Sequence, residues 1–335
     1  MYSPFSLYGN DGSDGSDGSD GSDGSDGSDG SDGSDGSSSS GVNAYSGRRT
    51  SALLANALLT TTGALTRGLT GAGFDLTNPP ANLSSDEAME RWSRDVRARL
   101  YAYELMKGLD IKFTSALTGE VTQCDLSWTD GGGGTLRIVR PTYETGGIAK
   151  LKAEVEKVLY WSALRAERMA EILTQVRLPY SFFSMVLNLQ PGRHRHTYEV
   201  MASVFSFSTA VVMQLKHAFR IRRPADWSPW IQPVIQTPGH GAYPAGHASQ
   251  GYFQYLVLKD LIQTHATTES VYQLEHLAKR IAENRVVAGL HFIEDNERGK
   301  ELGEKLAAYY LKRVGTQQSL AWLWDRAKKE WLPRE

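Results

Sequence analysis

Most of the chain after residue 84 shows apolar residues recurring every three or four positions, with Glu, Lys and Arg between them. This spacing is typical of amphipathic helices. Ser84-Ser85-Asp86-Glu87 also has the Ser-x-x-Glu form of a capping box, which opens a helix. The predicted helices are Ser84 to about Lys107, Ile148–Gln175, Leu187–Phe219 with its helical start after Gly192, Ala248–Thr264, Val271–Leu290, Gly299–Val314 and Ser319–Leu332.

The pattern changes between Ile111 and Pro141. Val121–Trp128 and Thr135–Val139 are short strand-like runs, separated by Thr129, Asp130 and four glycines. No Gly-Lys-Ser/Thr follows the glycines, so they predict a hairpin loop and not a phosphate loop. The expected fold class is all-α, a helical bundle with one small β-hairpin.

The first 44 residues have a different character. Residues 11–37 are nine tandem Asp-Gly-Ser triplets, which hold no apolar residue to bury. We therefore expect residues 1–44 to be a disordered segment and residues 45–335 to form a single helical catalytic domain.

Charge is distributed unevenly along the chain. Residues 1–50 carry nine aspartates against two arginines, a balance of −7, so the remaining chain carries +5 of the total of −2. A mildly basic domain suits a small anionic ligand but lacks the basic stripe of a nucleic-acid-binding protein. The single cysteine, Cys124, excludes an intramolecular disulfide and a cysteine-based zinc site, and is expected in the core.

No membrane or secretion signal is evident in the sequence. Residues 1–10 lack a charged and an apolar region, and the most apolar candidate, Ser51–Leu69, is interrupted by threonines, a glycine and an arginine. These features predict a soluble, cytoplasmic protein with no membrane span.

Reactive side chains gather in three separated clusters. Taken singly, each has an ordinary interpretation: surface charges, a helix cap, and a polar pair on one face of a continued helix. The clusters are Lys216-x6-Arg223-Pro224, Pro244-Ala245-Gly246-His247 with His240 seven residues before His247, and Arg285-x5-His291-x3-Asp295.

Together the clusters describe a pocket for a tetrahedral oxyanion. Three cations and a backbone N–H at a helix N-terminus would bind its oxygens. One histidine would bond the central atom, with its other nitrogen held by the aspartate, and a second histidine would serve as acid or base.

In order and spacing, these clusters resemble the signature of the type 2 phosphatidic acid phosphatase (PAP2) and vanadium-dependent haloperoxidase superfamily over about residues 195–315. The pattern there is Lys-x6-Arg-Pro, Pro-Ser-Gly-His and Ser-Arg-x5-His-x3-Asp. Ala245 and Asn284 stand where that pattern has serine. Loss of the hydroxyl at Ala245 would cost oxyanion binding about 1–3 kcal/mol.

The resemblance implies a role for each motif residue. Lys216, Arg223 and Arg285 would bind the equatorial oxygens, with the Gly246 N–H helping. His291 would be the axial ligand of vanadium or the nucleophile toward phosphorus. Asp295 would orient His291, and His247 would be the general acid/base.

The loop around His240, and the run from Asn284 to His291, resemble the soluble bacterial and algal haloperoxidases. This implies a vanadate cofactor in a site that phosphate can also occupy, with His240 as a second proton acceptor and Lys216 polarising bound peroxide. Hydrogen peroxide, halide (bromide by preference) and a small organic acceptor would be its partners. The alternatives are a soluble PAP2-type phosphatase with a phosphohistidine intermediate, and a non-catalytic member.

The length of the globular part predicts assembly. Larger haloperoxidases of this superfamily can pack two four-helix bundles in one chain, and about 290 residues is shorter than that. We therefore expect a homodimer or higher homo-oligomer, with the Trp-rich segment Ser319–Leu332 as a candidate contact.

Overall fold

The computed structural model describes residues 82–129, 133–176, 180–263 and 265–332. The chain divides into two compact units, Met1–Arg91 and Trp92–Glu335. The Asp-Gly-Ser tract and the expected boundary near residue 45 lie outside the described residues, so both stay predictions.

The first predicted helix is two helices. The capping box is confirmed: Glu87 N donates to Ser84 Oγ over 3.2 Å, and Ser84 N donates to Glu87 Oε2 over 2.8 Å. It opens α2 (Ser85–Arg91), and α3 (Arg94–Lys107) begins separately. Ser93 accepts a hydrogen bond from Val96 N and caps the second helix. The helical period continues through the break, so the period alone did not reveal it.

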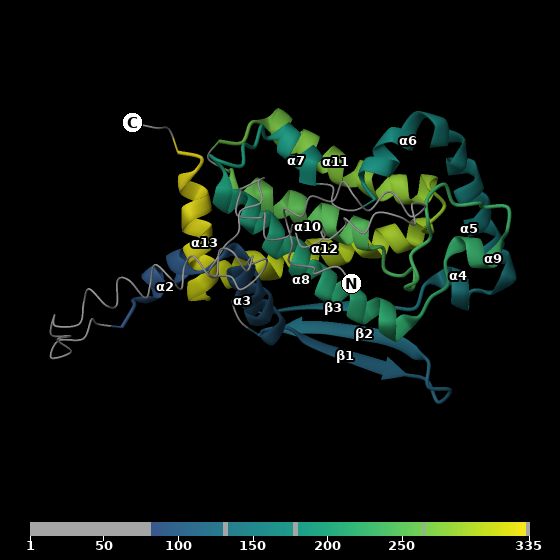
Figure 1. The fold of residues 1–335 in the computed structure, drawn as a ribbon. Coiled ribbons are helices and arrows are strands. Elements are labelled where there is room, and N and C mark those ends of the chain that lie inside the picture. Colours follow the sequence, from purple (N-terminus) through teal and green to yellow (C-terminus); the bar gives the residue numbers. More distant parts are fainter. Residues whose placement is uncertain (1–81, 130–132, 177–179, 264, 333–335) are drawn as a thin grey trace, which may run out of the picture. The chain divides into compact units, whose positions relative to one another are not determined.

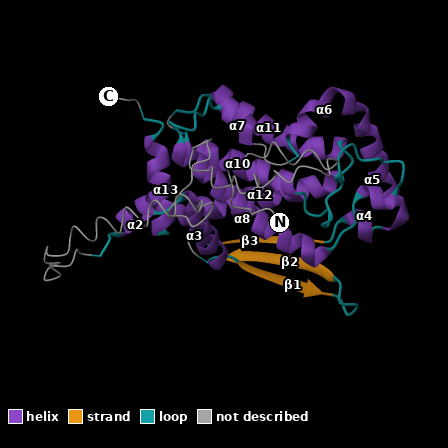
Figure 2. Ribbon diagram, in the orientation of Figure 1, coloured by secondary structure: helices purple, strands orange, loops and turns teal. Residues whose placement is uncertain are grey.

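A three-stranded antiparallel sheet lies against one side of the bundle (Figures 1 and 2). The predicted hairpin is confirmed as β2 (Val121–Trp128) paired with β3 (Gly134–Val139). The sequence missed β1 (Asp110–Ser115), which is largely exposed and so shows little apolar alternation. Cys124 is in the core as predicted, and burial raises the pKa of its thiol to about 12.

The all-α fold class is confirmed, with corrected helix boundaries. Predicted helix 148–175 is broken by a 3₁₀ turn, and the helices predicted from 248, 271 and 299 begin earlier. The remaining elements are α4 (Thr142–Thr145), α5 (Gly147–Trp161), η4 (Ser162–Leu164), α6 (Arg165–Thr174), α7 (Tyr180–Val186), α8 (Arg195–Phe219), α9 (Pro224–Trp227), α10 (Gly246–Leu261), α11 (Thr268–Val287), α12 (Ile293–Val314) and α13 (Gln318–Lys329).

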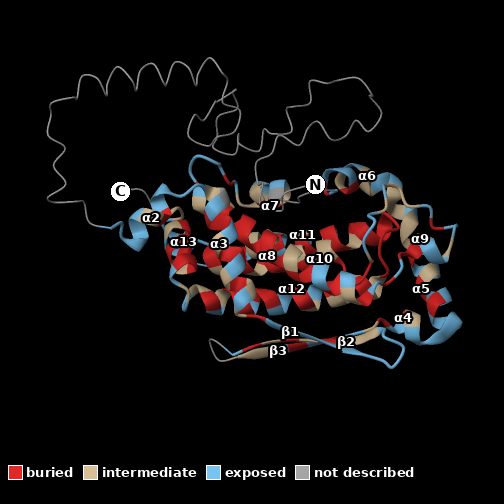
Figure 3. Ribbon diagram, turned by 60° about the horizontal axis from the view of Figure 1, so that its bottom comes forward, coloured by how far each residue is buried: buried red, intermediate tan, exposed pale blue. Residues whose placement is uncertain are grey.

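Helix α10 is the centre of the bundle and packs against α8, α11 and α12, whose facing sides are buried (Figure 3). Two glycines inside α12 allow its close approach to α10. A Cβ at Gly299 would lie 2.5 Å from Ala245 O, and one at Gly303 would lie 2.4 Å from Ser249 O. The two backbones meet at these positions, so a glycine is needed there inside α12. Gly299 therefore does not start a helix, contrary to the prediction from the sequence.

Helix α8 lies in a candidate membrane span that was not expected from the sequence. Among the described residues, the segment Arg195–Trp227 is long and apolar enough to cross a membrane, and 67% of its most apolar window is buried inside the chain. A core helix of a bundle has the same composition, because it is apolar on all sides. The predictions of a soluble, cytoplasmic protein and of no membrane span stay predictions.

The tryptophans of the C-terminal segment serve packing within the chain. Trp322 and Trp324 in α13 are buried, and the Trp322 ring lies beneath the guanidinium of Arg97. These two rings are therefore not available as the predicted contact between copies. The homo-oligomer itself stays a prediction.

Candidate functional site

Seven of the eight predicted site residues line one cavity of about 230 Å³, and the eighth lies directly behind it. The cavity is formed by the end of α8, the loop before α10, the first turn of α10, the end of α11 and the connection to α12. The predicted residues among its lining are Lys216, Arg223, His240, Gly246, His247, Arg285 and His291. Asp295 is fully buried and reaches the cavity through His291.

Lys216 and Arg223 are placed by the end of α8. The helix ends at Phe219 with Arg220 in the left-handed conformation, and Pro224 opens the short helix α9. Lys216 Nζ donates to Gly241 O over 2.7 Å and to Ala242 O over 2.6 Å, which ties the loop to the helix. Arg223 Nη1 donates to Leu290 O over 3.0 Å. The two cations therefore connect all three sequence motifs.

His291 and Asp295 meet by a different route from the continued helix that their spacing suggested. His291 lies between α11 and α12, and Asp295 lies in the first turn of α12. Asp295 Oδ2 accepts from Phe292 N over 3.0 Å and from His291 Nδ1 over 3.2 Å. A carboxylate near a helix N-terminus is the usual way to satisfy such N–H groups. The contact between His291 and Asp295 was predicted correctly, but the continuous helix expected to bring them together was wrong.

The tautomer of His291 follows from its two neighbours. Carboxylate oxygen accepts, so Nδ1 carries the proton. Arg223 can only donate, and its Nη1 lies 3.4 Å from His291 Nε2, so Nε2 presents a lone pair. Burial, and then the charge of Arg223, lower the pKa of His291 well below its usual value. The ring is therefore neutral at neutral pH and ready to act as a nucleophile or a metal ligand.

Sequence reasoning missed Tyr143, which holds the other oxygen of Asp295. Its hydroxyl donates to Asp295 Oδ1 over 2.7 Å, and its ring contacts Phe292 with centroids 4.4 Å apart. Burial raises the pKa of Asp295 to about 6. Tyr143 lies 152 residues from Asp295 in the chain and in no motif, so no local signal pointed to it.

Arg285 is buried with part of its donor capacity unused. Its Nη2 donates to Ile172 O over 3.2 Å and to Gln175 Oε1 over 3.3 Å. Its Nε and Nη1 are buried and have no hydrogen-bond partner among the described residues. A buried cationic N–H group without an acceptor is costly, and an anion in the cavity would satisfy it. Burial also lowers the pKa of Arg285 to about 10.

Gln175 is a second missed residue, and it links two walls of the site. Its backbone oxygen accepts from His247 Nε2 over 2.7 Å, while its side chain accepts from Arg285 and, over 2.9 Å, from Asn284 Nδ2. Asn284 also donates to Glu171 Oε2 over 3.0 Å. The asparagine that departs from the superfamily pattern thus helps to fix the residue that anchors Arg285.

The N-terminus of α10 supplies backbone donors to the cavity. Ala245 is its N-cap residue, and no described side chain caps it. Ala245 N donates to Asp295 O over 3.0 Å, so the first turns of α10 and α12 are joined. Gly246 and His247 follow and line the cavity. Uncapped N–H groups and the positive end of the helix dipole favour an anion here.

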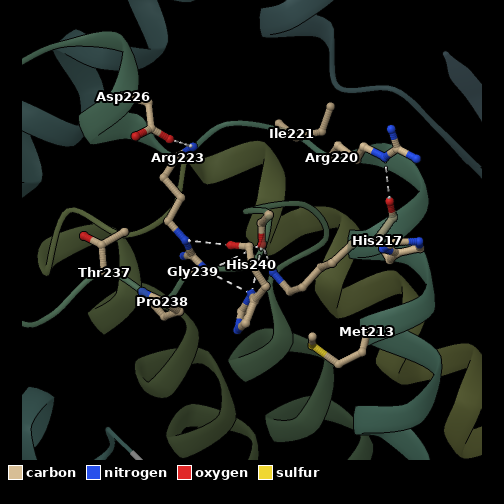
Figure 4. Close-up of a pocket in the computed structure, with 12 residues that line it drawn as sticks. Met213, His217, Arg220, Ile221, Arg223, Asp226, Thr237, Pro238, Gly239 and His240 are labelled. Carbon is tan, nitrogen blue, oxygen red and sulfur yellow. Dashed lines mark hydrogen bonds between the residues drawn. The ribbon is translucent and has the colours of Figure 1, made fainter.

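His240 faces Arg223 across the entrance (Figure 4). Its Nδ1 lies 3.2 Å from Arg223 Nη2 and 3.2 Å from Gly241 O. The first contact requires an unprotonated Nδ1, because arginine only donates, and the second requires a protonated one, because a carbonyl oxygen only accepts, so only one of the two can be a hydrogen bond at a time. Burial, and then the charge of Lys216, lower the pKa of His240. The ring is therefore a neutral base at neutral pH.

The described part of the site carries more positive than negative charge. Three cations line the cavity, and Asp295 is the carboxylate at its wall. Burial, and then Arg223, lower the pKa of Lys216 well below its usual value, and burial likewise lowers the pKa of Arg223. An anion bound in the cavity would raise both pKa values again, so the arrangement is suited to bind an anion.

Comparison with known proteins finds similarity among solved structures. No family model and no curated protein matches the chain. Among solved structures, the chain is similar to "the first transmembrane PAP2 type phosphatidylglycerolphosphate phosphatase from Bacillus subtilis". The sequence identity is 18% and the TM-score is 0.32, over 50% of this chain and 95% of that one.

Proposed function

We propose that this chain is a phosphohydrolase that transfers the phosphoryl group of a phosphate monoester to His291 and then to water. One observation supports this above all others. His291, with its Nε2 lone pair, and Arg285, whose buried Nε and Nη1 have no hydrogen-bond partner among the described residues, line the same cavity. Phosphoryl transfer depends on positioning and on charge stabilisation of the transferred group, and this pairing supplies both.

In the first step, His291 Nε2 attacks phosphorus. An N–P bond forms, the ester P–O bond breaks, and its electron pair goes to the leaving alkoxide oxygen. Asp295 stabilises the positive charge that develops on the ring, through Nδ1. Arg285, Arg223 and the Gly246 N–H would bind the equatorial oxygens.

His247 would protonate the leaving group and later activate water. Its Nε2–H is held by Gln175 O, so Nδ1 is the atom that can exchange a proton with a ligand. Burial, and then Arg285, lower the pKa of His247 to about 3 in the protein alone. A bound phosphate dianion raises that pKa, so the acid form arises with substrate present. In the second step water adds to phosphorus, the N–P bond breaks, and His247 takes the proton.

The rate should depend on the ionisation of Asp295. Its pKa of about 6 lies above the ordinary value, so the charged form that holds His291 is lost as the pH falls through about 6. A phosphate monoester also loses its second negative charge near pH 6. We expect log kcat/KM to fall on the acid side with a slope of about 2 in the wild type and about 1 in Asp295→Asn. Equal slopes in the two proteins would contradict this role.

A vanadate-dependent haloperoxidase is the second candidate, and His240 favours it. A neutral base at the entrance, beside Lys216 and Arg223, is placed to take a proton from peroxide. The donor set that fits phosphate also fits vanadate, because the two ions share charge and tetrahedral shape. Vanadate, held by His291 and the three cations, would supply a Lewis acid that activates hydrogen peroxide toward halide.

Paired assays on one preparation separate the two functions. A chromogenic phosphate ester would be tested without vanadate, and a halogen acceptor would be tested with vanadate, hydrogen peroxide and bromide. We expect phosphate release and no bromination. Bromination without phosphate release would overturn the proposal in favour of the haloperoxidase. Inactivity in both assays, with no vanadate binding, would indicate a non-catalytic protein.

A further inference from the structure

A second and larger pocket of about 620 Å³ adjoins the oxyanion cavity (Figure 4). The two share five lining residues, so one opens beside the other: Met213, Lys216, Arg223, Pro238 and His240. A phosphate ester with its phosphoryl group at His291 must place its organic part outside the small cavity. The outer pocket is the adjoining space that can receive it.

The outer pocket is rich in cationic groups. Besides the shared Lys216 and Arg223, it is lined by Arg220, against the single carboxylate of Asp226 among its described lining. That carboxylate already accepts from Arg223 N over 2.8 Å at the start of α9. The organic part of a ligand would therefore meet positive charge, in addition to apolar contacts from Met213.

Arg220 has a backbone conformation that its residue type disfavours. It ends α8 at φ 54° and ψ 35°, where its N–H donates to Lys216 O over 3.0 Å. Glycine is the usual residue at such a helix end, because the left-handed region is crowded for a side chain. A non-glycine residue held in this conformation suggests a function for its side chain.

Arg220 is exposed at the rim of the outer pocket, so its side-chain donors are accessible both to water and to a ligand. Its Nε donates to His217 O over 3.2 Å, which fixes the guanidinium against the end of α8 (Figure 4). Its two terminal nitrogens have no acceptor among the described residues. An arginine anchored in this way presents two parallel N–H groups, which suit a carboxylate or a phosphate.

We propose that Arg220 recognises a second anionic group, so that the preferred ligand is a phosphate monoester whose organic part carries a carboxylate or a second phosphate. This rests on the proposed function, because the phosphoryl group is taken to occupy the cavity at His291. The inner cavity then selects the phosphoryl group, and the outer pocket selects the substrate among phosphate esters.

Calorimetric binding of stable phosphonates tests the proposal. Alkyl phosphonates would be compared with ω-carboxyalkyl phosphonates of equal chain length, and with alkylene bisphosphonates to distinguish a carboxylate from a phosphate. We expect the doubly anionic ligand to bind about 10-fold more tightly at its best length. Arg220→Gly should remove that advantage and leave alkyl phosphonate binding unchanged.

Arg220→Gly is a favourable variant to make, because glycine suits the left-handed position and the fold should not be weakened. The matched control is Arg222→Gly. Arg222 is exposed, lies over the ring of Trp227 and is not among the residues lining the outer pocket, so this variant removes the same charge nearby. The control should keep the advantage.

The outcomes separate the two proposals. If alkyl phosphonates fail to bind the wild type, the oxyanion site and this inference are both overturned. If they bind but the second anion adds nothing at any length, or its advantage survives in Arg220→Gly, the role of Arg220 alone is overturned.

Discussion

Replacing His291 by alanine is expected to lower kcat for phosphate ester hydrolysis by about 10⁴-fold or more, because the variant has no atom to form the covalent intermediate. The wild type stopped under alkaline denaturing conditions should carry phosphate on histidine, and the variant should not. Phosphate binding should remain measurable by calorimetry, since the unpartnered donors of Arg285 do not depend on the imidazole.

The control for this variant is His276→Ala. His276 is exposed on α11 and contacts Tyr272, outside the cavity, so its loss should leave turnover unchanged. Retention of turnover by His291→Ala would mean that another residue is the nucleophile and that the site has been placed wrongly.

Replacing Arg285 by lysine should lower kcat by about 10²- to 10³-fold and weaken phosphate binding. Lysine keeps one positive charge but has no Nε and Nη1 edge to present to two oxygens, and it cannot also reach Ile172 O and Gln175 Oε1. Steady-state kinetics and phosphate calorimetry together measure the loss.

Arg280→Lys is the matched control for Arg285→Lys. Arg280 lies on the same helix, α11, its Nε and Nη2 donate to Glu171 over 2.9 and 2.6 Å, and it is not among the residues that line the cavity. We expect a small loss of stability and unchanged phosphate binding. If both lysine variants weaken phosphate binding equally, the effect belongs to the helix and not to the oxyanion site.

Local patterns in the sequence were sufficient for the helical fold class and for naming seven residues that line one cavity. The helical period predicted the bundle, because apolar residues must face a core along each helix. The three motifs placed Lys216, Arg223 and Arg285 in one site with His291, and the structure brings them to one cavity. Helix starts were less certain: the helices predicted from 248, 271 and 299 begin at Gly246, Thr268 and Ile293.

Only the tertiary structure decided how the site is held. Tyr143 and Gln175 reach Asp295 and Arg285 across 152 and 110 residues, and hydrogen bonds over such separations leave no periodic trace in the sequence. The sequence predicted that a helix starts at Gly299. The close packing of α12 on α10 instead requires a glycine at this position inside the helix. The unused donors of Arg285 are likewise a property of burial among particular neighbours, because an arginine in the sequence says nothing of which of its N–H groups will find an acceptor.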